Sequence, residues 1–101
     1  MTVEWKQTAL NDRTWFLVNA LERAIASADP QIHAAAAEQD DRIEAEGNAL
    51  DGVATYKQGP LADSHLYTTH DGHFVILYRR IGGRVEIERV RHSRSNWKPN
   101  P

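Results

Sequence analysis

One stretch near the end of the chain decides the fold: residues 73–97, HFVILYRRIGGRVEIERVRHSRSNW. Its apolar run, residues 74–78, is too short for a helix and is bounded by glycines, so it predicts a strand buried on both faces. Gly82 and Gly83 predict a two-residue hairpin turn, because both accept the positive φ angles that such a turn requires. A return strand follows, with β-branched residues at Val85, Ile87 and Val90.

The return strand has two further features. Ile87 and Val90 differ in parity, so either both faces of the strand are covered or a β-bulge lies near Glu88 and Arg89; we favour the bulge. The strand ends in a cationic edge beside an aromatic side chain, formed by Arg91, His92, Arg94 and Trp97.

The first half of the chain predicts one strand and two helices. Residues 2–6 alternate apolar and polar side chains, as a short strand does. Thr8 is expected to cap a helix that ends near Ala28, with an apolar stripe at helical spacing. Asp29-Pro30 combines an N-cap with a proline at the first helical position, so a second helix begins almost at once and is expected to end near Gly47.

The remaining residues predict an irregular crossing and a third strand. Residues 51–63 show no sustained period, with a short strand expected in residues 54–57. Residues 64–69 form a better strand, and Asp71-Gly72 predicts a two-residue turn into the next one. We therefore expect an α+β fold in one domain, residues 1–101. An N-terminal strand precedes a two-helix hairpin that packs on a small antiparallel sheet, whose C-terminal part is a three-stranded meander.

Composition narrows the class of protein. The 101 residues include no cysteine, which excludes a disulfide-stapled fold and a thiolate zinc site. The polar N-terminus lacks the pattern of a signal peptide, so we expect a cytoplasmic protein with no membrane association. His70 and His73 straddle a turn and are interpreted as turn residues, so neither a metal nor a cofactor is expected. Residues 1–50 carry four basic and nine acidic side chains, residues 51–101 eight and five, and this polarity could orient a charged partner.

These residues together resemble a known family. The Asp29-Pro30 junction, Ile43 and Leu50 leading to Gly59, and above all VILY at 75–78 followed by VEIERVRHSR at 85–94 are similar to the ParE/RelE superfamily of toxins from type II toxin–antitoxin systems. The resemblance covers nearly the whole chain. It implies a small bacterial toxin held inactive by an antitoxin encoded beside it. ParE-like members poison DNA gyrase without a recognised catalytic site, whereas RelE-like members cleave messenger RNA on the ribosome.

Two departures favour the ParE-like branch. The family often has an arginine straight after the glycine that closes the crossing segment, and another on the next strand; here Pro60 follows Gly59, and the strand carries His65. We therefore predict an inhibitor of DNA gyrase that forms a hetero-oligomer with a ParD-like antitoxin, has no catalytic residues and does not itself bind nucleic acid. A member that no longer poisons any target is a further alternative.

The main alternative is a RelE-like ribonuclease. Cleavage through the 2′-hydroxyl needs proton transfer, which histidine performs near neutral pH, and cations around the phosphate, for which arginine is suited. The residues available for these roles are His92, Arg94, Arg79, His65 and Lys57.

An antitoxin surface is predicted from two groups of residues. Trp15 lies opposite the apolar stripe of the first helix, with Val18 beside it at helical spacing, and tryptophan is enriched among interface anchors. Basic side chains on the C-terminal hairpin would attract acidic residues of the antitoxin in a salt-sensitive way. These are Arg79, Arg89, Arg91 and Arg94.

Overall fold

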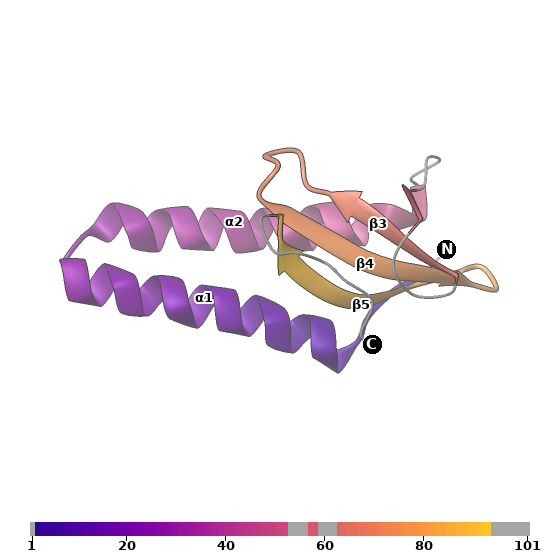
Figure 1. Ribbon diagram of the computed structural model, residues 1–101, viewed down its shortest axis with the longest axis horizontal. Coiled ribbons are helices and arrows are strands. Elements are labelled where there is room, and N and C mark those ends of the chain that lie inside the picture. Colours follow the sequence, from indigo (N-terminus) through magenta and orange to yellow (C-terminus); the bar gives the residue numbers. More distant parts are fainter. Residues whose placement is uncertain (1, 53–56, 59–62, 94–101) are drawn as a thin grey trace.

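A computed structural model describes residues 2–52 and 63–93, together with the backbone pairing of residues 57–58. Two helices lie against one mixed sheet, and their distal turns extend beyond the strands (Figure 1). The elements follow in the order β1 (Thr2–Trp5), α1 (Gln7–Ser27), α2 (Pro30–Asn48), the 3-10 turn η1 (Leu50–Gly52), β2 (Lys57–Gln58), β3 (Ser64–Thr68), β4 (Phe74–Ile81) and β5 (Arg84–His92). The α+β class is confirmed. The short strand expected in residues 54–57 lies mostly outside the described residues.

The sheet has the order β1-β5-β4-β3-β2, and its C-terminal part is the expected meander. Strands β2 to β5 pair antiparallel, but β1 pairs parallel to β5, from Thr2 opposite Arg84 to Trp5 opposite Ile87. The expectation of an antiparallel sheet was therefore wrong at this edge. The helical hairpin carries the chain across the sheet between β1 and the meander, so β1 joins beside β5 without a tight turn.

The two hairpin turns differ. Gly82 and Gly83 have φ angles of 51° and 41° and join Ile81 to its partner Arg84, which confirms the two-residue turn. The turn at Asp71-Gly72 is longer than predicted, because the backbone pairing resumes only between Thr69 and Phe74. The Asp71 carboxylate accepts hydrogen bonds from the Thr69 hydroxyl at 2.6 Å and the His73 N–H at 3.0 Å. These side-chain bonds replace those of a two-residue turn.

The bulge in β5 is confirmed. Leu77 pairs with Arg89 and Tyr78 with Ile87, so Glu88 is the extra residue. The bulge turns Val90 to the same face as Val85 and Ile87, and all three side chains have no exposed surface. They pack with Ile76, Tyr78, Phe74, Ile43, Leu50 and Ala9 in the core.

The helix ends agree with the sequence except at the start of α1. Asp29 caps α2 by accepting a hydrogen bond from the Gln31 N–H at 2.9 Å, as predicted. Thr8 does not cap α1, whose N-cap is Lys6 without a side-chain bond. α2 ends at Asn48, near Gly47 as predicted, and a Cβ atom at Gly47 would overlap Trp5 Cζ2. The glycine permits this close approach of helix and strand.

Candidate functional site

The outer edge of β5 is covered by the backbone of β1 along its first half and by side chains of α1 along its second half. Residues 84–87 pair with β1, and the Lys6 N–H donates to the Ile87 carbonyl at 2.9 Å. Past that point, side chains of α1 lie beside β5. The Thr8 hydroxyl donates to the Glu88 carbonyl at 2.6 Å, and Asp12 accepts the Val90 N–H at 2.9 Å. Two residues one helical turn apart therefore bond to the backbone groups of β5 that have no strand beside them once β1 has ended.

Arg89 belongs to the same junction. Its guanidinium donates two hydrogen bonds to the Asp12 carboxylate, at 2.8 and 3.0 Å, and these bonds raise the pKa of Arg89 above its ordinary value. A bidentate pair of this kind fixes orientation as well as charge. Arg89 thus ties β5 to α1, a contact that its place in a basic cluster did not predict.

A groove continues from this junction along α1. Trp15 is 61% exposed and Val18 44% exposed, in agreement with the prediction that they lie off the core. The part between α1 and β5 has a volume of about 350 Å³ and is lined by Asn11, Asp12, Trp15, Phe16 and Arg91. On the other side of Phe16 a part of about 580 Å³ adds Asn19, Glu22, Arg23, Ala26 and His92. We call the two parts together the Trp15 groove. It brings Trp15 and Arg91, predicted separately, to one surface.

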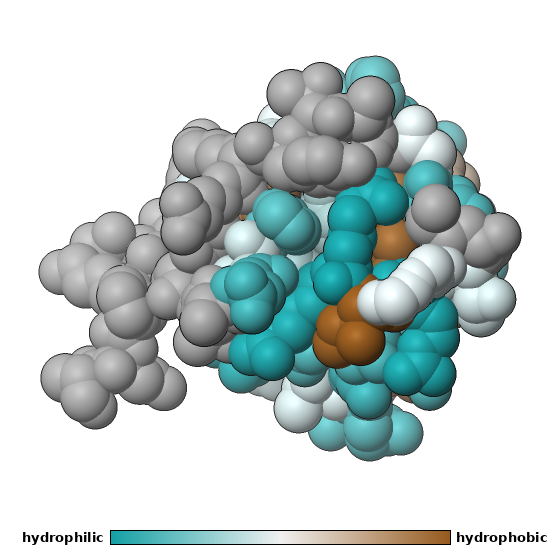
Figure 2. Space-filling model, turned by 90° about the vertical axis from the view of Figure 1, so that its right-hand side faces the viewer, coloured by the Kyte–Doolittle hydropathy of each residue, from teal (hydrophilic) through white to brown (hydrophobic). Residues whose placement is uncertain are grey.

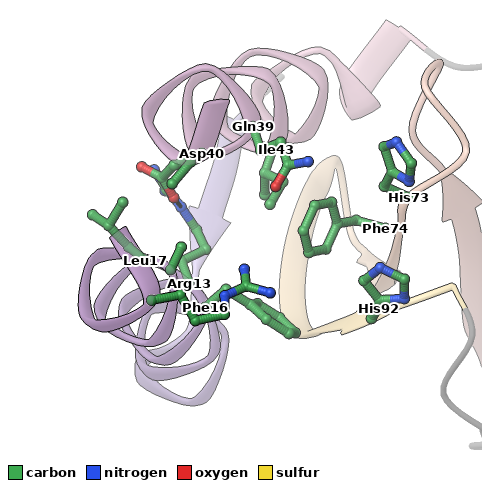
Figure 3. Close-up of a pocket in the computed structure, with 12 residues that line it drawn as sticks. Arg13, Phe16, Leu17, Gln39, Asp40, Ile43, His73, Phe74 and His92 are labelled. Carbon is green, nitrogen blue, oxygen red and sulfur yellow. Dashed lines mark hydrogen bonds and ion pairs between the residues drawn. The ribbon is translucent and has the colours of Figure 1, made fainter. Parts of the chain in front are cut away.

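A second cavity, the Phe74 pocket, opens between the two helices and the end of the sheet, with a volume of about 350 Å³. His73 and His92 lie on either side of Phe74, which points toward the helices (Figure 3). Phe16 meets Phe74 edge to face, with ring centroids 5.1 Å apart, and the His73 and His92 centroids are 6.3 Å apart. Leu17, Ala20, Ala36 and Ile43 complete the apolar wall.

The charges around this pocket are unevenly paired. Arg13 bridges the helices, donating to Asp40 at 3.0 Å and to Glu44 at 2.9 Å. Burial opposes its charge, but those hydrogen bonds keep the pKa of Arg13 above its ordinary value. Arg23, on the exposed side of the pocket, has no carboxylate partner among residues 2–52 and 63–93. The rim therefore carries one guanidinium available to an anion.

The three described residues of the ribonuclease alternative, His65, Arg79 and His92, do not gather at one point. His65 pairs with Tyr78 on the neighbouring strand, whereas His92 pairs with Phe74. Four residues along β4 separate these positions by about 13 Å. Arg79 lies on the face opposite to Tyr78, with its Nε 3.8 Å from Glu88. Arg94 and the side chain of Lys57 lie outside the described residues.

Sequence reasoning missed the Phe74 pocket and the Thr8–Asp12 contact with β5. Thr8 and Asp12 are four residues apart, so they share one helix face, but the sequence does not show that this face meets the edge of β5. Part of the pocket could have been predicted from the register of the C-terminal hairpin. Counting back from the Gly82-Gly83 turn and allowing one bulge residue places His92 opposite Phe74.

The described residues hold no group of three or more histidine, aspartate or glutamate side chains placed to bind a metal ion. The surface at the end of the sheet near the Gly82-Gly83 turn is mainly hydrophilic, with a small hydrophobic patch (Figure 2). Within the described part of the chain, neither helix has the length and apolar character needed to span a bilayer.

The sequence matches no family model and no curated protein. The fold is similar to a chain in the solved structure of a chromosomal ParDE toxin–antitoxin system from P. aeruginosa, with a TM-score of 0.64. The two chains are 13% identical, and the match covers 91% of this chain and 95% of the other. At this identity the likeness is one of fold.

Proposed function

We propose that this chain is the ParE-like toxin of a type II toxin–antitoxin module, acting in the cytoplasm as one domain. A ParD-like antitoxin neutralises it by binding to the Trp15 groove, which gives a hetero-oligomer. The observation that carries the proposal is Trp15, 61% exposed on a helix of a fold similar to that of a ParDE chain. A large aromatic side chain left in solvent is typical of an interface anchor.

Two features of the groove and its surroundings favour a protein partner. Trp15 and Val18 offer apolar surface at helical spacing. Arg91 lies at one end of the groove and would attract an acidic residue of the antitoxin. Arg79 and Arg89 have partners within the chain, Glu88 and Asp12, and neither lines the groove, so we assign them weaker roles in binding than Arg91, which does.

The target we propose is DNA gyrase, inhibited by binding without catalysis. The separation of His65 from His92 along the sheet supports this choice, because general acid–base cleavage requires both groups within reach of one phosphate. A RelE-like ribonuclease is the second candidate, favoured by the imidazoles of His73 and His92 side by side at the Phe74 pocket.

Expression of the toxin in bacteria separates the two candidates. Gyrase poisoning predicts DNA-damage signalling and cleaved-DNA complexes, which are scored in extracts of the arrested cells. Translational arrest with cut messenger RNA would contradict the gyrase proposal. Growth that stays normal would mean that the chain poisons neither target. Co-expression of the protein encoded by the adjacent gene should restore growth if that protein is the antitoxin.

A further inference from the structure

We infer that the Phe74 pocket seats one apolar side chain of the antitoxin, and that Arg23 at its rim binds a carboxylate that follows this side chain on the same segment. The inference rests on the proposed function and deepens it, because it states the chemistry of the partner's anchor. The partner segment would carry a large apolar residue and an aspartate or glutamate within one helical turn.

The size and walls of the pocket fit a single side chain. About 350 Å³ is at the lower end of the range for small-molecule sites, so the space admits one aromatic or aliphatic group rather than a helix. Phe16 and Phe74 present two rings whose planes differ by 69°, and an inserted ring could pack against both. The exposed lining of the pocket is more polar than apolar, so the pocket could hold an apolar side chain against the two rings together with a charged neighbour of that side chain.

The charged residues around the Phe74 pocket favour an anionic residue next to the antitoxin side chain that enters it. Asp40 is the carboxylate in the wall, and it is occupied by Arg13 through bonds of 3.0 Å from both Nε and Nη2. Arg23 has no such partner among the described residues, and the exposed ring of His73 adds a possible donor. A carboxylate at the rim would therefore meet unpaired positive charge, whereas an ammonium group would not.

The pocket and the Trp15 groove form one continuous surface. Phe16, Arg23 and His92 line both, so a segment bound along α1 reaches the pocket without leaving the protein. Arg23 is exposed on α1, one helical turn beyond Asn19 of the groove. One partner segment could thus cover Trp15 and fill the pocket together.

The first test uses a small probe and no antitoxin. Titration of the protein with 3-phenylpropionate, followed by backbone NMR, should shift the amides of Phe16, Ala20 and Phe74, with a dissociation constant on the order of millimolar. The uncharged 3-phenylpropanamide and the cationic phenethylamine should bind at least about fivefold more weakly. Arg23→Gln should lower the affinity for 3-phenylpropionate to that of the amide, whereas Arg84→Gln, at the far turn, should leave it unchanged. No shifts at about 20 mM probe, or equal binding of all three probes, would overturn the inference.

The second test uses the protein encoded by the adjacent gene. Arg23→Gln should weaken its binding about five- to thirtyfold, with Arg84→Gln again as the control. If the partner binds wild type and Arg23→Gln equally well but loses affinity for Trp15→Ala, the pocket inference fails and the proposed function stands. If the partner does not bind wild type at all, the proposed function fails, and the 3-phenylpropionate titration still decides the chemistry of the pocket.

Discussion

The two halves of β5 differ in what lies along their outer edge. From Arg84 to Ile87 the edge is covered by the backbone of β1, which pairs with every residue. From Glu88 onward the bulge turns the strand, and side chains take over at the outer edge: Thr8 bonds to the Glu88 carbonyl and Asp12 to the Val90 N–H. Beyond them the strand end borders the Trp15 groove. Side chains of α1 thus take the place of a neighbouring strand at Glu88 and Val90, and the end of β5 lies beside the exposed Trp15.

The largest expected loss of stability concerns the half of β5 that pairs with β1. Gly47→Val should lower the free energy of unfolding by about 3 kcal/mol or more, because the added Cβ alone would lie 2.4 Å from Trp5 Cζ2 and 3.1 Å from Ile87 Cδ1. Chemical denaturation measures the loss. Gly52→Val is the matched control, since a Cβ atom there has nothing within 4 Å. Equal losses for both variants would show that the contact with Trp5 does not hold β1 in place.

The next largest loss of stability is expected in the half of β5 whose outer edge is covered by side chains of α1. Asp12→Ala should lower the free energy of unfolding by about 2 kcal/mol, because it removes the partner of Arg89 and the acceptor of the Val90 N–H. Amide hydrogen exchange should speed up at Val90 but not at Ile87, whose strand stays paired with β1. Asp41→Ala, on the exposed side of α2, is the control and should change stability by less than about 0.5 kcal/mol. Uniform acceleration along β5 would mean that its two halves open together.

A smaller effect is expected at Thr8. Thr8→Val keeps the shape of the side chain but removes its 2.6 Å hydrogen bond to the Glu88 carbonyl, at a cost of about 1 kcal/mol. Thr14→Val is a control on the same helix, because the Thr14 hydroxyl bonds only to the Leu10 carbonyl of its own helix, at 3.0 Å. The thermal midpoints of the two variants should differ by several degrees. A difference near zero would place the bulge carbonyl in contact with water.

The sequence predicted most of the fold because its local signals agreed with the packing. Gly82-Gly83, the parity change before Val90, and Asp29-Pro30 each depend on a few neighbouring residues, and each prediction is confirmed. Long-range contacts explain the errors. Thr8 fits a capping position, but its partner is Glu88, 80 residues away in the chain. β1 was expected in an antiparallel sheet, yet it pairs parallel with β5, where Thr2 lies opposite Arg84, 82 residues further along the chain.

The candidate site could be predicted only in part. Trp15 and Val18 were found because an apolar residue on a polar helix face is visible in the periodicity. The Phe74 pocket was not, because it depends on which residues of two strands and two helices meet. The basic residues were recognised as a group. Their charge alone did not show that Arg89 pairs with Asp12 or that Arg91 lines the Trp15 groove.

The most direct test of the account is the Trp15→Ala variant, measured for stability and for affinity to the protein encoded by the adjacent gene. We expect a thermal midpoint within about 2 °C of wild type, because the side chain is 61% exposed, and a loss of affinity of more than about tenfold. A large fall in stability would place Trp15 in the core. Unchanged affinity for a partner that binds wild type would show that the edge beside β5 is not where the antitoxin binds.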